Sequence, residues 1–354
     1  MQILDRYIGR HVALGTLLVM GLLLSLFAIF SFMDELNRVG RGNYGTLQAL
    51  QYVLLLLPGL VYQLLPIAAL LGSTIGLGVL ASNSELTIMR AAGVSLRRII
   101  WSTMKVGLVF VALTLVMGES IAPIAEQNAR TLRSIAISDK LAMKGQSQLW
   151  ARDGESFVNV REILPGERLG RIYIYERDAS HHISRMVQAE SAAFRKNKWI
   201  LENVVSSELG EGQVVSRHEK AVEWNTNLSF DLLSVVTVHP STLSVRGLYQ
   251  YIDYLRENGL DSSTYEHAMW GKIVAPIITG VMVFIAIPFV FGPLRSVGIG
   301  SRVLVGALAG IGFYLINQMF SYMGLVFGMN PVLIALTPAC LALVLGYWML
   351  RRIF

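Results

Sequence analysis

The chain has 354 residues, of which 53% are hydrophobic and only 15% are charged, so it is too apolar for an ordinary soluble domain. Its formal net charge is +6. The Lys and Arg residues cluster beside apolar runs and form no basic, aromatic-rich stripe, which excludes nucleic acid as the expected partner and indicates a membrane protein. The only cysteine, Cys340, lies within an apolar run, so no disulfide forms within the chain.

The apolar residues lie in two blocks. Residues 11–122 and 268–350 contain long apolar runs, while residues 126–265 hold most of the charge, which indicates one membrane unit interrupted by a polar domain. A helix that crosses about 30 Å of hydrocarbon needs roughly 20 apolar residues, and helix is the form expected because unpaired backbone groups are costly in lipid. The segments that meet this length are about 11–33, 54–80, 99–122, 268–291, 301–323 and 331–350.

A group of charged residues follows the first predicted span. Asp34, Glu35, Arg38 and Arg41 stand just beyond its apolar run. They either meet an anionic lipid head group or form an ordinary cluster of charges at the membrane surface. The residues alone favour neither interpretation.

Glycines with a spacing of four residues occur in the second and fifth predicted spans. Gly72 with Gly76, and Gly306 with Gly310, have the spacing that lets two helices approach closely. In a protein with several spans, such pairs serve packing within the bundle more often than association with a partner. We therefore expect them inside the bundle.

A short helix is predicted in the loop after the second span, at residues 82–93. Ser82 and Glu85 have the spacing of a capping box, and Gly93 is a typical helix terminator. Such a helix either docks into a groove on a partner protein or lies on the membrane surface. The candidate docking residues are Glu85, Leu86, Met89 and Arg90.

The polar block changes from helical to alternating periodicity near residue 148. Residues 156–160, 171–175 and 199–205 read as short strands separated by turn signals, which predicts a small β-sandwich or open barrel. The block ends in an amphipathic helix at about 243–258. On these features alone, a role as an extracellular cap, or as an adhesion or sensing module, is as well supported as a role in transport.

Short flanking segments predict the orientation. With a cytoplasmic N-terminus, the short inner segments hold most of the arginines beside the spans, and the short outer loops hold only Arg38 and Arg41. The positive-inside rule therefore places both termini in the cytoplasm and residues 123–267 in the periplasm. The inner arginines are Arg6, Arg10, Arg90, Arg97, Arg98, Arg295, Arg302, Arg351 and Arg352.

The chain lacks the residues expected of an energy-converting or catalytic subunit. No phosphate-binding G-x-x-x-x-G-K-[ST] loop occurs, so uphill transport would draw on another subunit or on an ion gradient. Few ionisable residues fall within the spans, mainly Lys105 and Glu119, which disfavours ion coupling. We expect no catalytic residues, no metal site and no cofactor.

Several specific motifs are spread along the chain, and they are Leu4-Asp5-Arg6-Tyr7-Ile8-Gly9, Ser84-Glu85-Leu86 with Ala92-Gly93, Gly118-Glu119 with Ala122-Pro123, Glu126-Gln127, and Phe291-Gly292-Pro293-Leu294-Arg295-Ser296-Val297. These motifs resemble the LptF/LptG family of lipopolysaccharide export permeases, with a match that runs almost end to end. The start of the chain and the Met269–Lys272 region look more like the LptG branch than the LptF branch.

The resemblance implies an α-helical membrane protein with six transmembrane helices and a periplasmic, jellyroll-like β-domain inserted between helices 3 and 4. The implied domains are residues 1–122, 123–267 and 268–354. The implied partners are a sister permease, LptF, two copies of the cytoplasmic ATPase LptB, the single-span protein LptC, the periplasmic bridge LptA, and lipopolysaccharide itself.

The resemblance also implies roles for individual residues. The helix that contains Glu85 would couple the permease to the ATPase, and the first and fifth spans would form a lipid gate. Asp34, Arg38 and Arg41 would lie near the lipid head group, and Arg295 and Arg302 would flank the gate helix on the cytoplasmic side. Some relatives carry a lysine where this sequence has Ser31, which leaves the head-group contacts open. A permease for another lipid or lipoprotein, and a membrane-anchored sensor, remain the alternatives.

Overall fold

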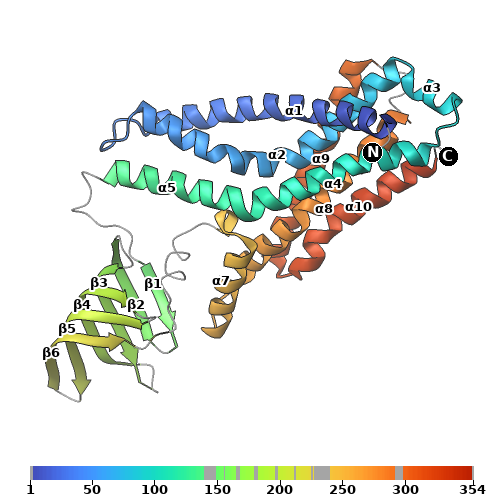
Figure 1. Cartoon of the computed structure of the whole chain (residues 1–354). Coiled ribbons are helices and arrows are strands. Elements are labelled where there is room, and N and C mark those ends of the chain that lie inside the picture. The colour runs from blue at the N-terminus through green and yellow to red at the C-terminus, as the bar shows by residue number, and fades with distance from the viewer. Residues whose placement is uncertain are drawn as a thin grey trace. The chain divides into compact units, whose positions relative to one another are not determined.

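A computed structural model shows a long helical unit and a β-rich unit (Figure 1). The helical unit comprises Met1–Ala136 and Ser263–Phe354, and the β-rich unit comprises Ile137–Ser262. The structure describes residues 3–138, 149–154, 156–164, 168–178, 182–195, 198–210, 213–224, 226, 240–291 and 298–352.

The helical unit confirms the predicted spans. Within the described residues, six helical segments are long and apolar enough to cross a membrane, and each contains one of the predicted runs. The long helices are α1 (Ile3–Leu36), α2 (Thr46–Ser82), α4 (Leu96–Val116), α5 (Ala122–Ser138), α8 (Ser263–Phe291), α9 (Ile299–Phe327) and α10 (Pro331–Arg351). A short helix, α3 (Glu85–Ala91), joins α2 to α4.

The third span is longer than its apolar run. A π-helical segment, η1 (Met117–Ile121), joins α4 to α5 without a break, so the helix continues well beyond residue 122. Gly118 within η1 lies against the ring of Tyr62, and a Cβ atom there would come within 2.5 Å of that ring. The wider π-turn and the missing side chain therefore let α2 pack closely at this point.

Glycines bring α1 and α2 into backbone contact. Gly72 lies against Thr16, and Gly76 lies against the backbone of His11 and Val12, so neither position has room for a side chain. On α9, a Cβ atom at Gly306 would meet Leu71 at 3.0 Å. The prediction that these glycines pack inside the bundle is confirmed.

The β-rich unit is a six-stranded antiparallel sheet in which each strand pairs with its neighbours in sequence. All three predicted strands are present, within β2, β3 and β5. The strands are β1 (Leu149–Asp153), β2 (Ser156–Leu164), β3 (Arg168–Arg177), β4 (Ile183–Arg195), β5 (Lys198–Gly210) and β6 (Gln213–Trp224).

Alternation along the strands buries one face of the sheet. In β3, Ile172 and Ile174 are buried, while the tyrosines between and after them are only partly covered. The predicted amphipathic helix is α7 (Val245–Glu257), preceded by the short 3₁₀ helix η2 (Pro240–Thr242). The apolar face of α7 is buried, and the Tyr254 hydroxyl donates to the carbonyl of Arg152 at 2.8 Å, which ties the helix to the first hairpin.

Candidate functional site

Helix α3 lies at the end of the helical unit that also holds both chain termini, which we call the terminal end (Figure 1). The helix begins after Ser84, whose backbone is left-handed with φ of 62°. The predicted capping box does not form, because Ser82 belongs to the end of α2 and its hydroxyl donates to the carbonyl of Val79 at 2.9 Å. Gly93 ends the helix as predicted, with φ of 87°, a conformation that suits glycine.

Glu85 is held by its own chain at the start of α3. The Tyr7 hydroxyl of α1 donates to one carboxylate oxygen at 2.7 Å, and the amide of Asn83 donates to the other at 3.3 Å. The side chain is still partly exposed. A partner protein could therefore reach a carboxylate that is already oriented by α1.

The remaining candidate docking residues divide between the two sides of α3. Leu86 is 3% exposed and Met89 is partly buried, and both pack into the core of the helical unit. Arg90 is exposed, and Ile88, which the sequence pattern did not single out, is 64% exposed. The side of α3 that a partner can reach therefore carries Ile88 and Arg90, while Leu86 and Met89 anchor the helix.

A second polar contact fixes the start of α1 near α3. Lys105 on α4 pairs with the Asp5 carboxylate at 2.5 Å, and the Ser102 hydroxyl donates to the same carboxylate at 2.7 Å. Because Asp5 and Tyr7 belong to the first turns of α1, this helix contacts both α4 and α3. Lys105, one of the few ionisable residues within the predicted spans, is thus an ion-paired residue that links two helices. The pair was not evident in the sequence because 100 residues separate its two members.

Arg302 does not lie on an open flank of α9. Its side chain is 2% exposed, and its guanidinium donates to the carbonyl of Gly78 on α2. This contact anchors the start of α9 to α2. The other predicted flanking residue, Arg295, lies outside the described residues.

The charged group after α1 surrounds a buried carboxylate at the opposite end of the unit, which we call the distal end. Glu35 is 3% exposed, accepts a hydrogen bond from the Tyr44 hydroxyl at 2.9 Å, and lies 3.6 Å from the guanidinium of Arg133 on α5. Arg38 lies 3.7 Å from the same carboxylate. Burial, together with the hydrogen bond to Glu35, raises the pKa of the Tyr44 phenol. The phenol therefore stays protonated, and its hydroxyl donates the hydrogen bond to Glu35.

The three head-group candidates therefore differ in their surroundings. Asp34 and Arg41 are exposed, whereas Arg38 is half-buried beside Glu35, and Ser31 is partly buried. Local sequence indicates that Glu35 stands at the edge of a span, but nothing local indicates its pairing with a residue of the third span. The distal end thus carries exposed charged side chains around the Glu35 carboxylate, which is held in place by Tyr44 and balanced by the nearby arginines.

Between these two ends, α1 and α9 expose broad apolar surfaces. Only 22% of the most apolar stretch of α1 and 11% of that of α9 are buried within the chain. Such surfaces face lipid or a partner helix when a protein spans a membrane. The large exposed side chains include Leu14, Leu18, Leu22, Ile29 and Phe30 on α1 and Leu304, Leu308, Ile311 and Leu315 on α9.

Comparison with known proteins gives one family and several close relatives. The family described as lipopolysaccharide export system permease LptF/LptG matches residues 6–352. The lipopolysaccharide export system permease protein LptG of Escherichia coli K12 is 38% identical over 353 residues, which cover 99% of this chain and 98% of that protein. The protein of the same name from Haemophilus influenzae is 37% identical over 351 residues, with the same coverage.

Proposed function

This chain belongs to the LptF/LptG family of lipopolysaccharide export permeases, and we propose that it is the membrane subunit of an ATP-driven exporter. In this proposal it takes lipopolysaccharide from the inner membrane and passes it to a periplasmic bridge, LptA. The family match over nearly the whole chain carries the proposal. A permease of this family is a transmembrane component of a multi-pass transporter and not its catalytic subunit, so a separate ATPase hydrolyses ATP.

The proposed orientation places the terminal end in the cytoplasm and the distal end at the periplasmic surface. The arginines at the start of α1 and around α3 support this placement by the positive-inside rule. Helix α3 is then accessible to a cytoplasmic ATPase. The β-rich unit, within residues 123–267, is then periplasmic.

The apolar surface of α1 and α9 suits the energetics of the task. Removing a lipid chain into water costs about 0.8 kcal/mol for each CH₂ group, so a chain of twelve carbons costs on the order of 10 kcal/mol. A lipid with several chains must therefore follow a continuous apolar route. We place that route between α1 and α9 of this chain and the corresponding helices of the sister permease, LptF, with LptC adding a single span beside them.

The charged residues at the distal end support a head-group role. Arg38 and Arg41 are positive residues beyond the apolar face of α1, where an anionic head group would arrive. Asp34 is exposed beside them, and its negative charge lowers the net positive charge of this group. Arg38 lies beside Glu35, so we assign the main contact with the lipid head group to Arg41.

The coupling assignment rests on α3. Glu85 is oriented by Tyr7, and Ile88 and Arg90 are exposed beside it, so one side of α3 offers a carboxylate, an apolar side chain and a cation. We propose that this side docks on one of two LptB copies. Closure of the ATPase pair would move α3 and, through Tyr7, α1. That movement would narrow the apolar route between the two permeases and expel the lipid.

The proposal is tested by purifying the chain from its native membrane in mild detergent and identifying partners and lipid by mass spectrometry. The expected result is recovery of a second permease of this family, a cytoplasmic ATPase and lipopolysaccharide. Recovery of a different lipid would redirect the proposal to another cargo. Recovery of the chain without an ATPase, under conditions that preserve other exporters, would contradict it.

A further inference from the structure

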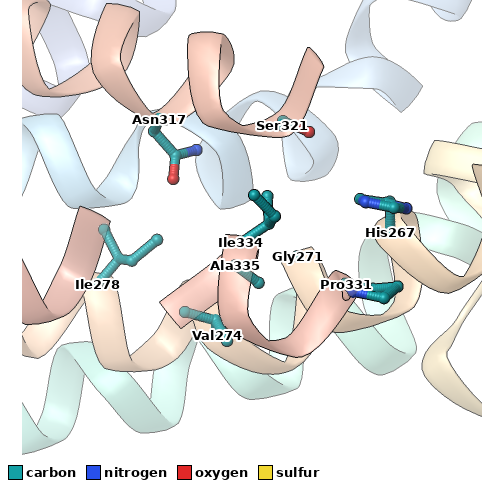
Figure 2. Close-up of a pocket in the computed structure, with 9 residues that line it drawn as sticks. All are labelled: His267, Gly271, Val274, Ile278, Asn317, Ser321, Pro331, Ile334 and Ala335. Carbon is teal, nitrogen blue, oxygen red and sulfur yellow. The ribbon is translucent and has the colours of Figure 1, made fainter. Parts of the chain in front are cut away.

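A cleft lies between α8, α9 and α10, near the start of α8, the end of α9 and the start of α10 (Figure 2). The cleft is partly open to the surface. Along α8 it extends from His267 to Ile278, which is about 16 Å at the rise of a helix. The lining residues are His267, Gly271, Val274, Ile278, Asn317, Ser321, Pro331, Ile334 and Ala335.

His267 presents a buried hydrogen-bond acceptor. Its Nδ1 lies 2.8 Å from the carbonyl of Ser263, and because a carbonyl only accepts, Nδ1 carries the proton. In the neutral ring, Nε2 is then an acceptor. The residue is 9% exposed, and Nε2 has no hydrogen-bond partner among the described residues. A buried polar atom without a partner is costly, so a donor is expected to meet it.

The position of the imidazole ring depends on a small neighbour. A Cβ atom at Gly324 on α9 would come within 2.6 Å of Nε2, so only glycine lets α9 lie against the ring. The ring in Figure 2 extends toward the middle of the cleft, where Ser321 and Ile334 also lie. The acceptor is therefore enclosed within the bundle beside the cleft that His267 lines, and it does not lie on the outer surface.

The rest of the lining is polar on α9 and apolar on α8 and α10. Asn317 points from α9 into the cleft, and Ser321 lies one turn further along the helix (Figure 2). Both side chains can donate and accept hydrogen bonds. Val274 and Ile278 continue the opposite wall as hydrocarbon. A guest that fits this lining carries one group that both donates and accepts, attached to an apolar chain.

We propose that the cleft binds a hydroxyl-bearing lipid chain. The hydroxyl donates to Nε2 of His267 and accepts from Ser321, and the hydrocarbon lies along Val274 and Ile278 toward Asn317. The chain spans a membrane, so such a guest reaches the cleft from the surrounding bilayer. The proposal concerns a site between α8, α9 and α10, and it does not depend on the gate or coupling roles proposed above.

The first test compares two photoactivatable probes on the purified full-length chain: a diazirine-bearing 1-octanol and the corresponding octyl methyl ether, which cannot donate. Labelled residues are identified by peptide mass spectrometry. One neutral hydrogen bond is expected to favour the alcohol about fivefold in labelling of the cleft residues. Equal labelling by alcohol and ether, or no labelling of the cleft by either probe, would overturn the proposal.

Two substitutions test the hydrogen-bond acceptor of His267 and the free volume of the cleft separately. His267→Phe keeps a ring of similar size without Nε2, so alcohol labelling should fall to the level of the ether. A Cβ atom at Gly271 would meet nothing within 4 Å, so Gly271→Leu should fill the cleft and abolish labelling by both probes. Tyr322→Phe, at an exposed site on α9, is the control and should leave labelling unchanged. Unchanged alcohol labelling in His267→Phe would overturn the hydrogen-bonding role.

The source of the hydroxyl is identified in the native membrane. A photo-crosslinking amino acid in place of Ser321 should capture a lipid that carries a free hydroxyl on a hydrocarbon chain. The mass of the adduct identifies that lipid. Adducts formed mainly with lipids that lack such a hydroxyl would overturn the proposal.

Discussion

Helices α8 and α9 have the same length and are both strongly apolar, yet they occupy opposite situations in the helical unit. Each contains 29 residues. The most apolar stretch of α8 is 67% buried within the chain, against 11% for α9. Apolar composition explains why both helices enter a membrane, whereas only packing distinguishes the helix that holds the unit together from the helix whose surface remains free.

The difference has a structural cause. Helix α8 packs against α2, α4 and α10, and side chains such as Val283 and Ile287 are fully enclosed. Helix α9 is anchored at its start by Arg302 and packs mainly on α2 and α10. Its other sides carry large apolar residues outward, as does much of α1. Substitutions should therefore affect folding in the enclosed regions and transport or assembly on the free surfaces.

The largest effect is expected where α1 meets α2. Gly72→Leu would force a side chain into the backbone of Thr16 and separate the two helices, so overpacking should cost about 3 kcal/mol or more and deplete folded protein. Gly21→Leu is the matched control, because a Cβ atom at that position of α1 meets nothing within 4 Å. Yield and thermal stability in detergent measure both variants, and equal losses would contradict the packing contrast.

The next effect concerns α3, which combines an enclosed side and a free side. Glu85→Ala should leave the membrane fold intact and reduce lipid-stimulated ATP hydrolysis at least about tenfold, the effect of losing a charged contact of about 1.4 kcal/mol or more. Co-purification of the ATPase and the hydrolysis rate are the measurements. Tyr7→Phe removes the internal hydrogen bond but keeps the carboxylate, so it should retain the ATPase. Normal ATPase recruitment and hydrolysis in Glu85→Ala would remove the coupling assignment.

The sequence predicted the elements better than it predicted their faces. Span positions followed from apolar runs of sufficient length, and the strands followed from alternation and turns. Apolar spacing placed Leu86 and Met89 on one side of α3, but it could not tell whether that side faces the core or a partner. The pairs formed by Asp5 with Lys105 and by Glu35 with Arg133 join distant spans, and such pairing depends on how the helices assemble.

A moderate effect should separate α8 from α9 directly. Ile287→Ala on α8 leaves a cavity in an enclosed site and should lower the free energy of unfolding by about 2–3 kcal/mol. Leu308→Ala on α9, where the side chain is 62% exposed, should change it by less than about 0.5 kcal/mol. Denaturation in detergent micelles measures both values. Comparable losses in the two variants would show that α9 is packed more tightly than its exposure indicates.

A smaller effect is expected at the distal end, where enclosed and exposed carboxylates are adjacent. Glu35→Gln removes the charge that Arg38 and Arg133 approach, and it should cost about 1–2 kcal/mol because both arginines remain partly exposed to solvent. Asp34→Asn, at an exposed position, should have almost no effect on stability. Thermal unfolding of the two variants tests the contrast, and a larger loss for Asp34→Asn would reverse the assignment of the buried centre.

The proposal that lipid passes along the exposed surface of α1 is tested most directly by site-specific photo-crosslinking in the native membrane. A photo-crosslinking residue replaces Ile29 on α1 or, as a control, Val344 on α10, which are 58% and 66% exposed. The account predicts lipopolysaccharide adducts at Ile29 that decrease when ATP drives export, and few or none at Val344. Equal adducts at both positions, unaffected by ATP, would contradict it.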